Sequence, residues 1–173
     1  MTFMDKLKFL KALYSTDKLD RMVRCHLIME TENIPCDFLE TLKLRFPKLP
    51  ESYLNFLKVY GDLKIDWFTF FGATSEGGIP LLEMLEIWEG YDIHHFEKNG
   101  YCPIGEDSGS DLYCLNEQGQ VIMFDSINVE EAPQFIADSF DIFMNEHVLG
   151  KNYPEFAKED NEFYQFLQSQ GWA

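Results

Sequence analysis

The stretch YCPIGEDSGSDLYCLNEQGQVIMFD, residues 101–125, decides the fold of this chain. It contains three short apolar runs, at residues 101–104, 111–115 and 120–125, which we predict to be β-strands. The residues Asn116–Gly119 between the last two runs are typical of a hairpin turn. Both runs are apolar at nearly every position, which indicates central strands covered on both faces. The sequence therefore predicts a mostly antiparallel sheet with helices packed on it.

Helical patterns surround these strands. The clearest covers residues 49–61, where Pro50 suits the first turn, Gly61 suits the C-terminal cap, and one face is apolar. We predict further helices at residues 4–14, 17–30, 38–44, 80–96, 132–148 and 156–167, and one more strand at residues 63–71. These elements predict an α+β fold with a mostly antiparallel central sheet, flanking helices and extra N-terminal helices. We expect residues 1–45 to form a helical extension packed on a domain of residues 46–173.

The chain is acidic, with a formal net charge of -16, and its charge is unevenly distributed. Residues 1–50 hold nine Lys and Arg against seven Asp and Glu, whereas residues 51–173 hold five against 23. Between Lys98 and Lys151 there are ten acidic residues and no Lys or Arg. Such a surface repels nucleic acid and anionic lipid and attracts basic proteins, so we expect a basic protein partner and neither nucleic acid nor membrane. Acidity that serves only solubility is the alternative.

The cysteines and the N-terminal residues bear on the compartment. The four cysteines have no pair at metal-binding spacing: Cys25, Cys36, Cys102 and Cys114. The first apolar run is interspersed with charged residues, unlike a secretory signal, and no apolar stretch approaches the length of a membrane span. We therefore expect a cytoplasmic protein with free, mostly buried thiols.

The run Glu106-Asp107-Ser108-Gly109-Ser110-Asp111 between the first two predicted strands is the best local candidate site. We expect four of its residues to contact Lys and Arg side chains of the partner: Glu106, Asp107, Ser108 and Asp111. A tight turn is a compatible alternative, in which Gly105 and Gly109 take conformations that other residues avoid and Asp111 is partly structural.

Four further residues are candidates for the same contact surface: Asp66, Glu76, Glu86 and Trp88. Glu86 shares one stripe of the predicted helix 80–96 with two other glutamates, and Trp88 lies beside that stripe. Such a stripe is usually a solvated face. Asp66 precedes Trp67 in an aromatic strand, and we expect Trp67 to lie in the core.

The sequence favours neither a metal site nor an enzyme. The pattern Asp107-x-Gly-x-Asp111 lacks further acidic ligands of a calcium loop, since Gln118 stands at its twelfth position. His94 and His95 are adjacent and point about 100° apart on a helix, so one ion is not expected to bind both. There is no phosphate loop, nucleophile elbow or zinc signature, and few cations to stabilise developing negative charge. We expect no cofactor and no catalysis; a carboxylate-dependent hydrolase is a third hypothesis, which an activity screen would test.

Three blocks of the sequence resemble the SUKH (Smi/Knr) superfamily in their order and spacing. The blocks are Leu49-Pro50 with Tyr53, Phe56, Leu57 and Gly61; the run from Tyr101 to Leu115; and Ala137–Phe143 with Ser139-Phe140. The resemblance spans about residues 45–150. The chain departs from the minimal module by its longer N-terminal region, whose function stays open.

The resemblance implies a binding function without catalytic residues. Bacterial members are mostly immunity proteins that bind a toxin domain, often a nuclease or nucleic-acid deaminase, and fungal relatives are regulatory scaffolds. A nuclease holds a polyanion in a basic cleft, which fits an acidic partner. The sequence thus predicts a non-catalytic immunity-type protein, a monomer or weak homodimer, that neutralises a basic toxin domain. The alternative is a regulatory scaffold with several protein partners.

Overall fold

A computed structural model describes residues 1–30, 34–60, 62–73, 79–90, 94–128 and 131–173. The strands of the described part are β1 (Leu27–Glu30), β2 (Asp62–Ile65), β3 (Phe68–Gly72), β4 (Ile79–Pro80), β5 (Cys102–Glu106), β6 (Leu112–Leu115), β7 (Val121–Phe124) and β8 (Gln134–Ala137). The helices there are α1 (Phe3–Ser15), α2 (Arg21–Arg24), α3 (Cys36–Arg45), α4 (Glu51–Val59), α5 (Leu81–Gly90), α6 (Phe96–Asn99), α7 (Phe140–Ile142), the π-helix η1 (Phe143–Val148), α8 (Tyr153–Ala157) and α9 (Glu162–Ser169).

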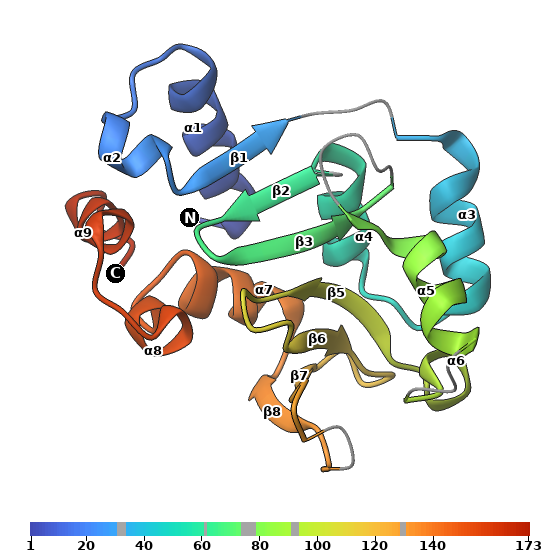
Figure 1. Ribbon diagram of the computed structural model, residues 1–173. Helices are drawn as coiled ribbons and strands as arrows, with labels where there is room; N and C mark the ends of the chain where they lie inside the picture. The colour runs from blue at the N-terminus through green and yellow to red at the C-terminus, as the bar shows by residue number, and fades with distance from the viewer. Residues whose placement is uncertain (31–33, 61, 74–78, 91–93, 129–130) are drawn as a thin grey trace.

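The strands of the described residues form one sheet in the order β1-β2-β3-β5-β6-β7-β8, and every neighbouring pair in this path is antiparallel (Figure 1). The short β4 pairs with β3 in parallel, off this path. The predicted fold class, an α+β fold with a mostly antiparallel sheet, flanking helices and N-terminal helices, is therefore confirmed.

The hairpin of β6 and β7 follows from its turn residues. Leu115 pairs with Val121, and the side-chain oxygen of Asn116 accepts hydrogen bonds from the backbone N–H of Gln118 (3.0 Å) and Gln120 (2.9 Å). Gly119 takes a φ of 78°, a conformation that glycine adopts without steric cost. The sequence prediction of a turn here is confirmed.

Aromatic rings join one face of the sheet to α4, α7, η1 and α8. The Phe68 ring of β3 lies 5.0 Å from that of Tyr113 on β6 and 5.5 Å from that of Phe156 on α8, between centroids. The Phe56 ring of α4 lies 5.1 Å from Phe70. Since full burial of such a ring stabilises by roughly 1.5–3 kcal/mol, this cluster dominates the core.

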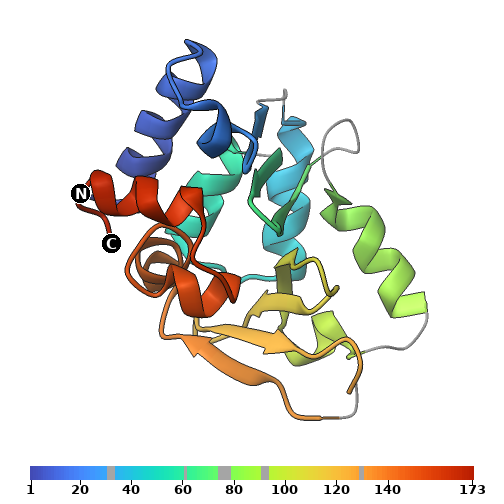
Figure 2. The same ribbon diagram turned by 60° about the vertical axis from the view of Figure 1, so that its left-hand side comes forward.

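The N-terminal helix α1 belongs to the same core. Phe3 lies 5.5 Å from the ring of Phe140, and the buried Lys6 donates hydrogen bonds from Nζ to the carbonyl oxygens of Asn145 (3.2 Å) and Leu149 (2.8 Å) at the end of η1. Figure 2 shows α1 (dark blue) beside α9 (red), with both chain ends on that side. The division into an extension of residues 1–45 and a domain of residues 46–173 stays a prediction.

The other face of the sheet is covered by α5 and α6. The ring of Trp88 on α5 lies 5.6 Å from Phe71 of β3 and 5.5 Å from Phe96 of α6. Phe96 in turn contacts Phe124 of β7. The strands β3 and β5 to β7 are thus covered on both faces, as predicted for β6 and β7 from their continuous apolar sequence.

Two predicted helices are partly strands. Residues 17–30 form only the short α2 and then β1, where Leu27 and Met29 are buried and Ile28 between them is 40% exposed, a period of two. Residues 132–148 begin as β8, which pairs with β7. The helix starts only after Ser139, whose Oγ accepts a hydrogen bond from the Ile142 N–H at 3.2 Å. Phe135, an apolar residue of the predicted helix, is 56% exposed on β8.

Two predicted single elements are pairs. Residues 63–71 form β2 and β3, and the chain reverses at Asp66, which has a φ of 56°. Residues 156–167 span α8 and α9, separated at Lys158 with a φ of 58°. The predicted helix 80–96 ends at Gly90 in the described part, and a short α6 follows residues 94–95. The predicted cap Gly61 lies outside the described residues, and α4 is preceded by Pro50.

Two remaining findings concern the cysteines and the length of the helices. Cys102 and Cys114 are buried free thiols and Cys25 is an exposed one, while the Cys36 side chain lies outside the described residues. Burial raises the pKa of the Cys102 and Cys114 thiols, which keeps them protonated and unreactive. Within the ranges that the structure describes, no helix combines the length and apolar composition needed to cross a membrane.

Candidate protein-binding site

The loop between β5 and β6 is organised around Asp107. The side chain of Asp107 is only 7% exposed, and its Oδ1 accepts hydrogen bonds from the backbone N–H of Gly109 (2.8 Å) and of Asp111 (3.0 Å). The N–H of Ser110 donates to the Asp107 carbonyl oxygen at 3.0 Å. Asp107 therefore fixes the loop from inside, a structural function that adds to any contact with a partner.

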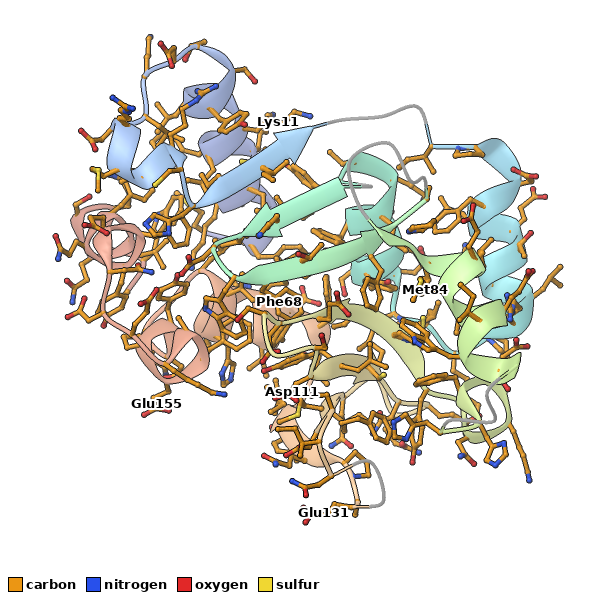
Figure 3. All side chains as sticks on the ribbon, in the orientation of Figure 1. Lys11, Phe68, Met84, Asp111, Glu131 and Glu155 are labelled. Carbon is orange, nitrogen blue, oxygen red and sulfur yellow. The ribbon has the colours of Figure 1, made fainter. Side chains whose placement is uncertain are left out.

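The same loop is tied to the end of β7. Asp111 Oδ1 accepts a hydrogen bond from the Ser126 N–H (2.9 Å), and the Ser126 hydroxyl donates to the Gly109 carbonyl oxygen (2.8 Å). The expectation that Asp111 is partly structural agrees with this geometry. In Figure 3, Asp111 lies between α8, where Glu155 is labelled, and the β7–β8 connection with Glu131.

The glycines of this loop do not act as predicted. Neither Gly105 nor Gly109 has a φ in the left-handed region; Ser110 does, at 64°. Gly105 is required for a different reason, since a Cβ there would lie 2.5 Å from Cε1 of Phe68 and 2.6 Å from the Thr69 carbonyl oxygen. The two strands approach too closely for any larger residue.

Glu106 and Ser108 flank Asp107 at the surface. Glu106 is half-buried at the end of β5, and Ser108 is exposed. Burial and then the nearby Asp107 charge raise the pKa of the Glu106 carboxyl. The structure thus brings Glu106, Asp107, Ser108 and Asp111 together, while their contact with a partner stays a prediction.

A hollow of about 330 Å³ lies beside this loop. Its lining combines the loop with the β2–β3 turn and the α8–α9 connection: Trp67, Asp107, Ser108, Gly109, Asp111, Ala157, Lys158 and Glu159. In Figure 1 the β2–β3 turn and the β5–β6 connection point to the same end of the sheet, beside α8. Three segments, each at least 40 residues from the next in sequence, therefore build one concave surface.

Asp66 is mostly buried rather than a surface contact. Its side chain is 12% exposed, and its Oδ1 lies 2.8 Å from Nδ1 of His26. Its Oδ2 accepts hydrogen bonds from the Tyr153 hydroxyl and from Asn161 Nδ2 at 2.7 Å. A carboxylate oxygen accepts hydrogen bonds, so the contact with His26 is a hydrogen bond in the tautomer with N–H on Nδ1. We call these four residues, Asp66, His26, Tyr153 and Asn161, the Asp66 clasp.

The remaining candidates lie elsewhere. Glu86 is exposed on α5, and Trp88 is half-buried in the ring contacts that hold α5 on the opposite face of the sheet from α8. They are not joined to the loop. Glu76 lies outside the described residues. Within the described residues, no group of three or more His, Cys, Asp and Glu side chains could hold a metal ion. The ring of His94 lies 4.2 Å from that of Phe124, between centroids.

Comparison with known proteins places the chain in a family. The model of the SMI1 / KNR4 family (SUKH-1) matches residues 38–146, more than half of the chain. The chain belongs to this family. A search of the curated proteins found no match. SUKH proteins of this family are generally non-catalytic.

The SUKH match includes the acidic loop and Asp66 but ends before α8 and α9. Lys158 and Glu159, which line the hollow, therefore lie outside the SUKH range, and sequence reasoning missed them. No local pattern links residues 157–159 to residues 107–111, because only the tertiary fold brings them together. Trp67 was missed as a lining residue because residues 63–71 were predicted as one strand with Trp67 in the core.

Proposed function

We propose that this protein is a non-catalytic immunity-type protein that neutralises a toxin domain by binding it through an acidic surface. Membership of the SUKH family supports a binding function. The observation that carries the proposal is the excess of negative charge between Lys98 and Lys151. In the described part of that region, seven acids have no ion pair with a Lys or Arg: Glu106, Asp107, Asp111, Asp125, Glu131, Asp138 and Asp141.

The partner that fits this charge is a basic, nucleic-acid-targeting toxin such as a nuclease. Such an enzyme holds its polyanionic substrate in a basic cleft, and an acidic protein bound there or at its rim blocks the substrate. Opposite fields also speed the encounter by about 10- to 1,000-fold. Rapid capture is what neutralising a toxin requires.

The contact surface that we propose is the end of the sheet around the β5–β6 loop. The hydrogen bonds to Asp107 and Asp111 hold this loop in one conformation before any partner binds. A loop that is already ordered loses less conformational entropy on binding. We further propose that the protein acts as a monomer or weak homodimer in the cytoplasm, where its buried thiols stay reduced.

A pull-down from the source organism tests the proposal. The tagged protein is expected to retain one dominant partner with a Lys- and Arg-rich domain, and to lose it when ionic strength rises tenfold, which shortens the Debye length about threefold. Several unrelated partners that resist salt would instead favour the regulatory scaffold.

Variants that add positive charge then locate the surface. Ser108→Lys adds a positive charge to the exposed loop, Glu86→Lys reverses the charge of the separate candidate on α5, and Glu40→Lys is an exposed control on α3 with the larger change in charge. We expect Ser108→Lys alone to slow association, with thermal stability unchanged. Equal effects of Ser108→Lys and Glu40→Lys would contradict a contact at the loop.

A further inference from the structure

The hollow beside the β5–β6 loop has walls that are held relative to one another. Trp67, on the β2–β3 turn, directly follows Asp66, and the clasp ties Asp66 to Tyr153 of α8 and to Asn161, which caps α9. The Phe156 ring of α8 lies 4.8 Å from Trp67 between centroids. These contacts fix the α8–α9 connection against the turn, so the hollow is preformed.

Asp107 brings a free acceptor into the wall of this hollow. The residue is 7% exposed, and its Oδ1 accepts both of the hydrogen bonds that its side chain receives within the described residues. Its Oδ2 accepts neither of them and is not sealed from solvent, so it can accept a hydrogen bond from the N–H group of a ligand.

The residues that line the hollow carry a net negative charge, which favours a cationic ligand. They include three acids, Asp107, Asp111 and Glu159, and one lysine, Lys158. A metal ion does not fit, because no described group of three or more acidic, His or Cys side chains is arranged to coordinate one. An organic cation with several donors does fit, and a hollow of about 330 Å³ is large enough for one side chain.

Guanidinium matches this lining better than ammonium. It is planar, presents five N–H donors, binds carboxylates in a bidentate manner and stacks on aromatic rings. Trp67 offers such a ring and Asp107, Asp111 and Glu159 offer carboxylates. Lysine, a compact and strongly hydrated charge, would use fewer of these groups.

We propose that this hollow is the anchor pocket for one arginine side chain of the protein partner. The partner's identity rests on the proposed function, whereas the pocket does not. Because Ala157, Lys158 and Glu159 lie outside the family match, this wall is supplied by the C-terminal helices and not by the SUKH range.

The test uses acetyl-arginine methylamide as the probe and the indole N–H resonance of Trp67, assigned with Trp67→Phe, as the NMR readout. We expect a saturable shift of this resonance with the arginine probe, a weaker one with acetyl-lysine methylamide, and none with acetyl-norleucine methylamide at equal ionic strength. The same shift with the norleucine probe would overturn the proposal.

Two neighbouring substitutions are expected to change the affinity for arginine in opposite directions. Glu159→Gln removes a negative charge and is expected to weaken arginine binding about two- to fivefold, the range of an exposed ion pair. Lys158→Met removes the competing positive charge and is expected to strengthen binding by a similar factor. Glu40→Gln on α3 is the matched control and is expected to change nothing.

The outcomes separate this inference from the proposed function. If the probe leaves Trp67 unshifted while the basic partner still binds in a salt-sensitive way, the pocket is refuted and the immunity-type function stands. If the probe binds, and Glu159→Gln weakens and Lys158→Met strengthens this binding, but no basic partner is retained, the pocket stands and the proposed function fails.

Discussion

Replacing Asp66 with alanine should destabilise the domain by about 3–5 kcal/mol, because it removes the shared acceptor of three hydrogen bonds and leaves alanine at a positive φ. The carboxylate, 12% exposed, accepts hydrogen bonds from His26 Nδ1, the Tyr153 hydroxyl and Asn161 Nδ2. Each hydrogen bond to a charged group is worth about 1.5–3 kcal/mol, but bonds that share one acceptor are not additive. Asp66 also has a φ of 56°, and alanine costs about 1–2 kcal/mol more in that conformation.

Two companion substitutions separate the side chain from the backbone. Asp66→Asn keeps a residue that tolerates positive φ and retains one acceptor oxygen, so we expect it to cost about 1–3 kcal/mol. Asp66→Gly loses every side-chain hydrogen bond but relieves the backbone, so it should fall between asparagine and alanine.

Urea unfolding at neutral pH, followed by tryptophan fluorescence, measures these free energies. The control Asp138→Ala changes an exposed aspartate and should stay within about 0.5 kcal/mol of the wild type. The reasoning is refuted if Asp66→Ala unfolds within about 1 kcal/mol of that control. A double-mutant cycle of Asp66→Asn with Tyr153→Phe should show coupling, because Asp66 accepts from the Tyr153 hydroxyl and helps to raise the pKa of Tyr153.

Three further predictions test the core and its ionisation. Gly105→Ala should cost about 1–3 kcal/mol in chemical unfolding because its Cβ would meet Phe68, whereas Gly90→Ala, with open space around it, should cost nothing. Lys6→Met should cost about 1–3 kcal/mol by leaving two carbonyl oxygens of the π-helix region without their donor, and exposed Lys8→Met should be neutral. Burial lowers the pKa of His94 below 6.5, so the unfolded chain binds more protons and stability falls as pH drops below that value. His94→Gln should therefore reduce the slope of melting temperature against pH between pH 5 and 7, while half-buried His147, whose pKa is also lowered, keeps part of it. An unchanged slope would contradict this assignment.

The parts of the fold that could be predicted are those with a local signature. The β6–β7 hairpin has turn residues at Asn116–Gly119 between two apolar runs, and both its strands form as expected. The helix α4 has Pro50 before its first residue and an apolar face, and these two features are also enough to predict it. Where the spacing of apolar residues and the turn or cap residues indicate the same element, tertiary contacts add stability without changing the local structure.

The secondary-structure predictions were wrong where contacts with distant segments determine the local structure. Leu27, Ile28 and Met29 are too short a run to distinguish a strand from a helix until β2 lies beside them. Likewise β8 is helical by composition but pairs with β7, which leaves Phe135 exposed. Asp66 reverses the chain inside a continuous aromatic run because the clasp compensates for its conformation.

The acidic loop was predictable as a cluster because Glu106 to Asp111 are contiguous in sequence. The inward orientation of Asp107 was not, since it depends on the backbone N–H groups of Gly109 and Asp111. Glu86 and Trp88 were grouped with the loop by charge and aromatic character alone. The sheet separates them, because α5 covers the opposite face.

The clasp explains how segments outside the family match shape a surface inside it. His26 precedes the match, while Tyr153 and Asn161 follow it, and all three contact Asp66 within it. The turn that they hold carries Trp67, and the C-terminal helices add Lys158 and Glu159 to the same hollow. Changes in these flanking segments would therefore alter the hollow while the β5–β7 sheet stays the same. We expect the segments outside residues 38–146 to determine which partner binds, and the sheet within that range to determine stability. Proteins that share a fold differ in function through their local surfaces.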